Sequence, residues 1–275
     1  MGDRRMDDIA QKRQSFDSLG ENYPVAEGVH IEQKSIAGVN CFWMDCEEPS
    51  TSNKVLVYVH GGCFLLGDIN SHKPLVSHMV NRMAIPGLFI EYGLAPEKPY
   101  PQGVNDLVGV IREFVETNPN KKLILAGDSA GGGLIATAIP RLVDIKPESI
   151  ETCVLLSPWV DLSCSSKSFN DNAEIDPVLS PAEMRNFASA YMVDTALAEA
   201  NPIERLECLF PPTLILVGTN EILIDDSKIT HAKIQKQQKK VKLSIYKGQT
   251  HVWLMDSIES DATVSALDEI AKFIL

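Results

Sequence analysis

A serine flanked by glycines marks the first segment of this chain that could do chemistry. The segment Gly127–Gly132 reads Gly-Asp-Ser-Ala-Gly-Gly, follows the apolar run Leu123–Ala126 and leads into a helix-like run, Leu134–Ile139. This order of strand, tight turn and helix is the context in which a G-x-S-x-G turn exposes a serine hydroxyl to a substrate and a base. Side chains at the two flanking positions would crowd the turn, so glycine is needed there. Ser129 is therefore the candidate nucleophile, and an ordinary glycine-rich turn is the alternative that the motif alone leaves open.

A second glycine loop, His60-Gly61-Gly62, follows the apolar run Val55–Val59. Acyl transfer through a serine places negative charge on an oxygen in the transition state, and losing one backbone N–H donor to that oxygen typically costs about 100- to 1,000-fold in rate. Hydrolases of this type take one donor from such an upstream loop and one from the residue after the nucleophile. We therefore expect an oxyanion hole of Gly61, Gly62 and Ala130, with a strand-ending turn as the alternative for the loop by itself.

The base should be a histidine, because imidazole can take and return a proton near neutral pH without large tuning. His251 follows the apolar run Leu243–Tyr246 and precedes the last helical pattern, which fits the chain order Ser, acid, His. The remaining histidines lie in the glycine loop, in a polar helix or ahead of the nucleophile: His60, His231, His30, His72 and His78.

The acid should lie after the strand Thr213–Val217, where it can fix the imidazole tautomer and stabilise its charged form. Glu221, Asp225 and Asp226 all qualify by position. Glu221 comes first and is favoured, although its extra methylene requires a slightly recessed backbone. Asp225 and Asp226 precede a helix, so N-capping is their alternative role, and Asp128 beside the nucleophile is expected to be structural.

Apolar runs alternate with helical patterns along most of the chain. Two amphipathic strands open the fold, His30–Ile36 and Asn40–Met44, with a turn at Ala37-Gly38. The later strands are expected at Val55–Val59, Leu88–Tyr92, Leu123–Ala126, Val154–Ser157, Thr213–Val217 and Leu243–Tyr246. The helices are expected at Pro74–Met83, Val104–Glu116, Gly132–Val143, Asp226–Gln238 and Glu259–Ile274. This order predicts an α/β fold with a largely parallel sheet covered on both faces, and ligands bind such sheets at the carboxyl ends of the strands.

One segment interrupts the alternation. No central strand is expected between Trp159 and Pro211, and a helical run is predicted from Asp176 through Met192. We expect residues 1–275 to form a single domain whose small helical cap comes from about residues 1–25 and 160–210.

These motifs together resemble the hormone-sensitive-lipase-like branch of the α/β-hydrolases, over roughly residues 55 to 275. The matching pieces are His60-Gly61-Gly62, Tyr92–Glu97, Pro99-Tyr100-Pro101, Gly127–Gly132, Ser157-Pro158-Trp159 and Thr250-His251. The chain departs from the family at three positions: Cys63 stands for a third glycine, Gly93 for an arginine, and Glu221 for the more usual aspartate.

The resemblance and the residues imply a serine carboxylic-ester hydrolase acting on short-chain acyl esters. Ser129 would attack the ester carbonyl, His251 would take its proton, and water would release the acyl group by the same route in reverse. No metal and no organic cofactor is expected. Two alternatives stay open: an amidase or peptidase with the same triad, and a non-catalytic small-molecule receptor on the same fold.

Composition agrees with a globular enzyme. The chain has 275 residues, 44% of them apolar, and a formal charge of −12, which argues against nucleic acid and anionic membranes as partners. The polar start, Met1 to Gln14, does not resemble a signal peptide, and no apolar run approaches the ~20 residues that span a bilayer. Six cysteines without metal-site spacing predict reduced thiols in a cytoplasmic protein. The expected partner is a small ester, and the sequence is also compatible with a homo-oligomer.

Overall fold

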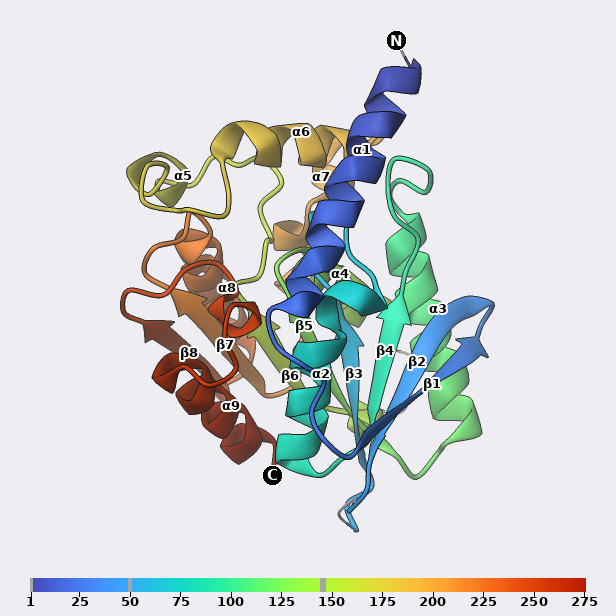
Figure 1. Cartoon of the computed structure of the whole chain (residues 1–275). Helices are drawn as coiled ribbons and strands as arrows, with labels where there is room; N and C mark the ends of the chain where they lie inside the picture. The colour runs from blue at the N-terminus through green and yellow to red at the C-terminus, as the bar shows by residue number, and fades with distance from the viewer. Residues whose placement is uncertain (1, 49–50, 144–146) are drawn as a thin grey trace.

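Eight strands form one sheet in the order β1-β2-β4-β3-β5-β6-β7-β8 in the computed structural model, which describes residues 2–48, 51–143 and 147–275 (Figure 1). The strands are β1 (Val29–Ile36), β2 (Val39–Cys46), β3 (Lys54–Val59), β4 (Gly87–Glu91), β5 (Lys122–Asp128), β6 (Ile150–Leu156), β7 (Thr213–Gly218) and β8 (Val241–Tyr246). β1 pairs antiparallel with β2 and β2 antiparallel with β4, whereas every pairing from β4 to β8 is parallel. The predicted α/β fold with a mostly parallel sheet is confirmed.

The turn between β1 and β2 lies at Ala37 and Gly38, as predicted. Both residues have positive φ, 51° and 75°, and the strands that they join pair Ile36 with Val39. Left-handed conformations at both central residues of a two-residue loop match the twist of an antiparallel hairpin.

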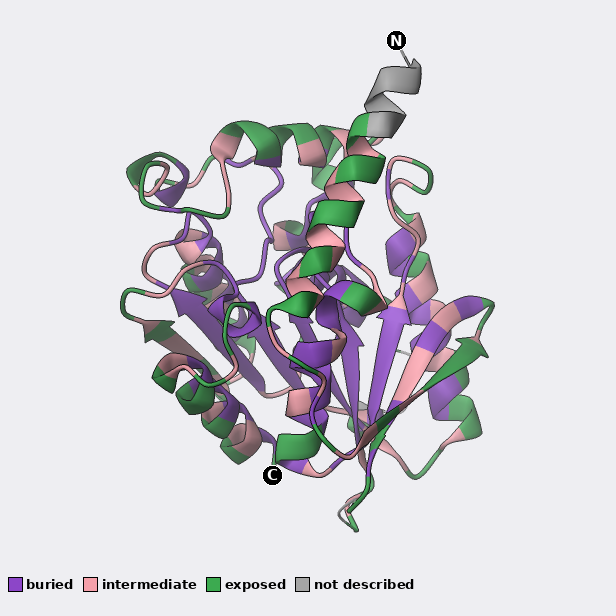
Figure 2. Ribbon diagram, viewed as in Figure 1, coloured by how far each residue is buried: buried purple, intermediate pink, exposed green. Residues whose placement is uncertain are grey.

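Helices cover both faces of the sheet (Figure 1). One face carries α2 (Ile69–Met83) and α9 (Asp261–Ile274), and the other carries α3 (Gln102–Thr117), α4 (Ala130–Ala138) and α8 (Ile224–Gln237). Alternate residues of β3 supply the two cores: Leu56 and Tyr58 pack on the first face, and Val55, Val57 and Val59 on the second. Because both faces are covered, the central strands are buried along their length (Figure 2).

The remaining helices lie beyond the carboxyl ends of the central strands (Figure 1). They are α1 (Gly2–Asp17), α5 (Ser168–Asp171), α6 (Pro181–Tyr191) and α7 (Leu197–Ala200). Short 3-10 turns connect several elements: Ser18–Glu21, Ile139–Arg141, Pro147–Ser149, Pro202–Arg205 and Trp253–Met255. Met1, which falls in the first expected cap segment, is outside the described residues.

Two helices, α2 and α6, begin more than a helical turn away from the residue that the sequence suggested, whereas the other predicted helices begin close to it. α2 begins at Ile69 rather than Pro74, because Asp68 and Ser71 form a capping box that starts the helix a turn earlier. α6 begins at Pro181 rather than near Asp176: Ser180 accepts a hydrogen bond from the Glu183 N–H, and proline suits the first helical position. Residues 176–180 are therefore a loop in front of α6.

Candidate active site

Ser129 lies on a tight turn between β5 and α4. Its backbone has φ 48° and ψ −120°, a conformation that costs energy for any residue with a side chain and that recurs at functional sites. The neighbouring glycines are required by space: a Cβ on Gly131 would lie 2.0 Å from the carbonyl oxygen of Val59, and one on Gly127 would lie 2.7 Å from it. Both glycines thus let the turn sit against the end of β3.

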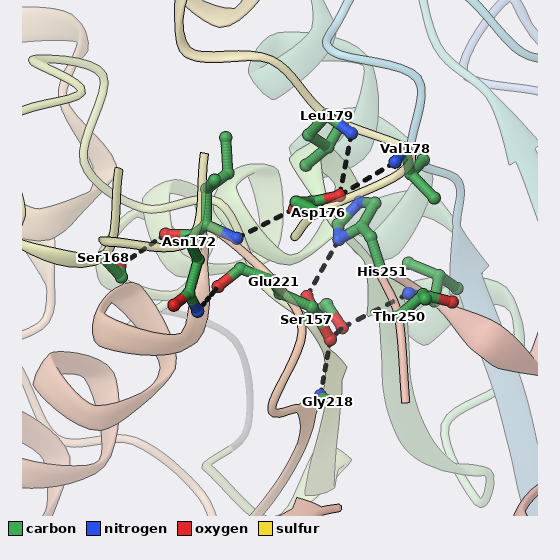
Figure 3. A network of polar contacts seen from close by, with 12 residues as sticks. Ser157, Ser168, Asn172, Asp176, Val178, Leu179, Gly218, Glu221, Thr250 and His251 are labelled. Carbon is green, nitrogen blue, oxygen red and sulfur yellow. Dashed lines mark hydrogen bonds and ion pairs between the residues drawn. The ribbon is translucent and has the colours of Figure 1, made fainter. Parts of the chain in front are cut away.

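The loops after β7 and β8 bring an acid and a base together. His251 Nδ1 lies 3.0 Å from Glu221 Oε2, and Glu221 is fully buried (Figure 3). The other oxygen, Oε1, accepts hydrogen bonds from the Ser157 hydroxyl at 2.8 Å and from the Gly218 N–H at 2.5 Å. Each carboxylate oxygen is therefore occupied, and the carboxylate is fixed against the imidazole.

Glutamate is one methylene longer than the more usual aspartate, and Gly218 shows how it is accommodated. The Glu221 side chain folds back toward the N–H of Gly218, which is the last residue of β7. A Cβ on Gly218 would lie 2.2 Å from the carbonyl oxygen of Gln249. The two loops are also joined directly, because Asn220 N–H donates to that same Gln249 oxygen at 3.0 Å. Close contact between the loops therefore sets the register of the acid against the base.

The environment of His251 favours its protonated form. Burial lowers its pKa, but the hydrogen bond and charge of Glu221 outweigh burial, and the negative charges of Asp176 and Asp128 act in the same direction. The net pKa lies above the ordinary value for histidine. With Nδ1–H donated to Glu221, Nε2 is the ring atom that can accept a proton.

His60 is a different kind of histidine. Burial lowers its pKa to about 4, so the ring is neutral at neutral pH. Its Nδ1 lies 2.7 Å from the carbonyl oxygen of Gly61, and the ring stacks on Tyr92 with centroids 4.3 Å apart. These contacts and the burial of the ring make His60 a residue that shapes the loop after β3.

Asp128 holds the glycine loop from below. Its Oδ1 accepts hydrogen bonds from the Gly61 N–H at 2.9 Å and the Tyr58 hydroxyl at 3.0 Å, and lies 3.4 Å from His72 Nε2. A Cβ on Gly61 would lie 2.1 Å from Asp128 Oδ2, so only glycine allows this approach. From the sequence, Gly61 is expected to be an oxyanion donor, but in the structure its N–H is bound to the carboxylate of Asp128.

Three backbone N–H groups near Ser129 are available as hydrogen-bond donors. In the described ranges, no acceptor partners the N–H groups of Gly62, Cys63 or Ala130. Ala130 is the first residue of α4, where N–H groups have no partner inside the helix and carry the positive end of its dipole. Gly62 and Cys63 both have positive φ, 102° and 57°, so the glycine loop turns sharply there.

Asp225 and Asp226 contact a different part of the molecule. Asp226 is fully buried, and its Oδ2 accepts hydrogen bonds from the N–H groups of Val160 and Asp161 at 3.0 and 2.9 Å. Burial raises the pKa of Asp226 to about 7. Asp225 Oδ2 accepts the Ser168 N–H at 2.9 Å. Both carboxylates therefore anchor the segment after β6, and they do not cap their own helix, whose N-cap is Leu223.

Three polar residues around the acid could not be predicted from the sequence. Ser157 stands there only as part of the Ser157-Pro158-Trp159 motif, and nothing in the sequence marks Asn172 or Asp176 as site residues. Ser157 contacts Glu221 itself, and the other two contact the backbone around it. The usable signal for Ser157 was a polar residue at the end of a buried strand.

A cavity of about 570 Å³ opens between α1, α6 and the loop after β3. Its walls are mostly apolar and include Phe16, Leu19, Cys63, Leu66, Val178, Leu179, Met184 and Phe187. Cys63 is buried there with its Sγ 3.8 Å from Met184 Sδ, and burial raises the pKa of its thiol to about 12. The thiol therefore stays protonated and acts as a small packing group.

Two basic residues of α1 fasten this helix over the cavity. Lys12 Nζ lies 2.8 Å from Glu183 Oε1 on α6. Arg13 donates to the Leu65 carbonyl oxygen at 2.8 Å and makes a two-pronged ion pair with Glu97, with contacts of 2.8 and 2.7 Å. α1 is thus tied both to α6 and to the loop that carries the glycines.

No group of three or more histidine, cysteine or carboxylate side chains in the described residues is arranged to hold a metal ion. No described helix is both long enough and apolar enough to cross a lipid bilayer.

The comparison with known families is decisive. Residues 56–255 match the family described as the alpha/beta hydrolase fold. The chain belongs to this family. The hydrolase is 30% identical over 269 residues to an esterase of Acinetobacter venetianus, covering 95% of this chain and 87% of that protein. It is 32% identical over 203 residues to an acetyl-hydrolase of Streptomyces hygroscopicus, covering 73% of this chain and 68% of that one.

Solved structures point to the same branch of the family. An esterase from the bacterial hormone-sensitive lipase family superposes with a TM-score of 0.91 at 27% identity, over 97% of this chain and 90% of that one. The predicted resemblance is confirmed: the hydrolase is an esterase of the hormone-sensitive-lipase type, a serine carboxylester hydrolase.

Proposed function

We propose that Ser129, His251 and Glu221 form the catalytic triad of this esterase. The observation that carries the proposal is the buried hydrogen bond between Glu221 and His251 at the same end of the sheet as the strained turn of Ser129. Glu221 holds the imidazole in the tautomer whose Nε2 can accept a proton, and stabilises the imidazolium that forms. Ser129 attacks the ester carbonyl, His251 passes its proton to the leaving alcohol, and water then releases the acyl group.

The oxyanion donors in this proposal are Gly62, Cys63 and Ala130. Their N–H groups have no partner in the described ranges, as a site for a developing negative charge requires. Gly61 takes a different role from the one expected: its N–H is bound to Asp128, and this contact holds the loop in place. The side chain at position 63 does not prevent the role, because a backbone N–H is the donor.

The substrate's acyl chain is proposed to lie in the cavity between α1 and α6. Residues 1–25 and 160–210 then act as the cap of a single domain spanning residues 1–275, since α1 and α6 supply most of the cavity wall. A volume of about 570 Å³ suits a small ester. Two relatives agree: one is named an acetyl-hydrolase, and EstE5, 28% identical with a TM-score of 0.87, was soaked with p-nitrophenyl butyrate.

A cytoplasmic location is part of the proposal. All six cysteines are free, and five of them are buried. Unpaired thiols are the usual state in a reducing compartment. The triad residues all come from one chain, so the proposed chemistry is the same for a monomer and for a homo-oligomer.

A panel of p-nitrophenyl esters of increasing acyl length tests the proposal. The purified protein should turn over chains of about two to six carbons fastest, in keeping with the acetyl-hydrolase among its relatives and the p-nitrophenyl butyrate soaked into EstE5. Ser129→Ala should lose about a million-fold in rate, because the triad acts as a unit. An optimum beyond about ten carbons would refute the acyl pocket, and retained turnover in Ser129→Ala would refute the nucleophile. The matching p-nitroanilides test the amidase alternative, for which we expect much slower cleavage.

A further inference from the structure

Three polar side chains of the cap, spaced four residues apart, contact the loop that carries the acid. Ser168, Asn172 and Asp176 lie on and just after α5, and a spacing of four places side chains on one face of a helical turn. All three contact residues between 219 and 225. The cap is therefore joined to the acid loop by side-chain hydrogen bonds from one short segment.

Asn172 binds the backbone of the acid directly. Its side-chain N–H₂ donates to the carbonyl oxygen of Glu221 at 2.7 Å and to that of Thr219 at 3.2 Å (Figure 3). Ser168 adds a contact at the next turn, because its hydroxyl donates to the Ile222 carbonyl oxygen at 2.5 Å. The carbonyl groups on both sides of the acid are thus held by the cap.

Asp176 links the acid loop to the wall of the cavity. One carboxylate oxygen, Oδ2, accepts the Ile222 N–H at 2.8 Å, directly after the acid. The other oxygen, Oδ1, accepts the N–H groups of Val178 and Leu179, both at 2.9 Å. Val178 and Leu179 line the cavity, so one side chain bridges the substrate pocket and the catalytic acid.

Asp176 also lies beside the proposed base. Figure 3 shows its carboxylate next to the His251 ring, and its negative charge acts to raise the pKa of that ring. Asp176 is 8% exposed, so its charge is weakly screened by solvent. The other charged groups that act on His251 are Glu221 and Asp128, and the half-buried Asp256 is near enough to sense its charge.

We propose that Asp176 is a positioning residue for ester hydrolysis, which couples the cap wall of the acyl pocket to the acid loop and stabilises the charged imidazole of His251. The proposal rests on the proposed triad and acyl pocket. A substrate that fills the cavity presses on Val178 and Leu179, and the Asp176 carboxylate transmits their position to Ile222 and hence to Glu221. Its charge supports the imidazolium that forms as Ser129 attacks.

The test is the pH dependence of kcat/KM in Asp176→Asn, whose acid limb reports the free enzyme's base. We expect a loss of about 10- to 100-fold on the plateau, since small misplacements of catalytic groups have effects of this size. The acid limb should also move to lower pH. Removing a nearby negative charge lowers the pKa of His251, and because the base is active when neutral, activity then extends to lower pH.

Two control variants separate charge from position. Asn172→Ala removes the contact with the Glu221 carbonyl but no charge, so it should lower kcat and leave the acid limb in place. Asp225→Asn makes the same carboxylate-to-amide change on a residue that binds Ser168 and Lys228, outside the groups that act on His251. It should leave the limb unmoved. If Asp176 only stabilised the fold, its replacement would lower the plateau activity without moving the acid limb.

A second readout does not depend on turnover. The ring pKa of His251, measured by NMR titration and assigned with His251→Gln, should be lower in Asp176→Asn than in the wild type. If Asp176→Asn does not fold, Asp176→Ser is measured in its place. An unchanged acid limb and ring pKa in the folded variant, or an equal shift in Asp225→Asn, would overturn the proposal. A wild type without esterase activity would refute the proposed function, while the NMR titration would still decide the role of Asp176.

Discussion

The floor of the site and the cap above it are built in different ways. The floor is formed by the turns after β3, β5 and β7, and the proposed cap by residues 1–25 and 160–210. On the floor, backbone contacts so close that only glycine fits hold the groups in place: Gly127 and Gly131 against Val59, and Gly218 against Gln249. In the cap, side chains hold whole segments: Arg13 ties α1 to the glycine loop, and Asp176 ties the segment before α6 to the acid loop.

These two kinds of contact place the chemistry in the floor and the substrate selectivity in the cap. Backbone contacts have little freedom, so the floor fixes the catalytic groups within narrow limits. Side-chain contacts can be replaced one by one, so most of the cap can change its pocket without disturbing the floor. Asp176 and Asn172 are exceptions, because both bind the acid loop. We therefore expect substitutions on the floor to lower kcat by large factors, and most cap substitutions to act mainly on KM.

The largest effect among the variants that sharpen this contrast is expected for Glu221→Gln. The amide keeps the size of the side chain but favours the wrong imidazole tautomer, and by analogy with a serine-protease acid the loss could approach ~10,000-fold in kcat. Asp225→Asn should cost much less, because its carboxylate lies against Ser168. Asp226→Asn should likewise spare the chemistry, because Asp226 contacts Val160 and Asp161. Kinetics on one p-nitrophenyl ester would decide, and a dead Asp225 or Asp226 variant beside an active Glu221→Gln would move the acid along the loop.

The next effect concerns a glycine of the floor. In Gly218→Ala the new Cβ would meet the Gln249 carbonyl oxygen, so the loop must shift and take Glu221 with it. We expect about a 100-fold loss in kcat and a lower free energy of unfolding in urea. Gly109→Ala in α3 is the matched control, because its Cβ would find ordinary contact with Ala37 and helix propensity favours alanine. Equal behaviour of the two variants would contradict the role given to close backbone contact.

A smaller effect is expected in the cap. Arg13→Gln removes the ion pair with Glu97 and loosens α1 over the cavity, while Ser129 and His251 keep their contacts. KM should rise by about 3- to 10-fold with little change in kcat, the pattern of lost ground-state binding. Arg82→Gln, which breaks an exposed pair with Asp268 far from the cap, should change neither constant. A fall in kcat without a change in KM would place α1 in the catalytic machinery instead.

The smallest effect is expected at Cys63. Its thiol is buried and its pKa is raised to about 12, so iodoacetamide should modify it far more slowly than the partly exposed Cys208. Cys63→Ala and Cys63→Gly should both stay active, because only the N–H of this residue serves the proposed oxyanion hole. Mass spectrometry of the alkylated protein, together with its activity, checks both points. A Cys63→Ala enzyme as inactive as Ser129→Ala would give the sulfur a catalytic part.

The same contrast explains which features could be predicted from the sequence. The strands, their succession along the chain and the turn of Ser129 follow from local patterns, because apolar runs and glycine spacing report the neighbouring backbone. The hydrogen-bond partner of the Gly61 N–H could not be predicted, since it depends on where the Asp128 side chain points. The start of α2 was missed for a related reason, because the capping box of Asp68 outweighs the proline within the helix.

The cap was the least predictable region. Its position could be inferred from the missing strand between residues 160 and 210, but its contacts could not. Arg13 and Glu97 are 84 residues apart, and Asp176 and Ile222 are 46 apart. Nothing in the local sequence of either partner indicates the other, and such long-range side-chain pairs appear only when the chain is folded.

Covalent labelling is the sharpest test of whether Ser129 is the nucleophile that His251 activates. The esterase would be treated with a fluorophosphonate or a sulfonyl fluoride, and modified peptides would be identified by mass spectrometry while activity is followed. We expect loss of activity to track modification of Ser129 alone, with His251→Gln labelled far more slowly. Labelling of a different serine in step with inactivation, or full esterase activity after complete modification of Ser129, would show that Ser129 is not the nucleophile.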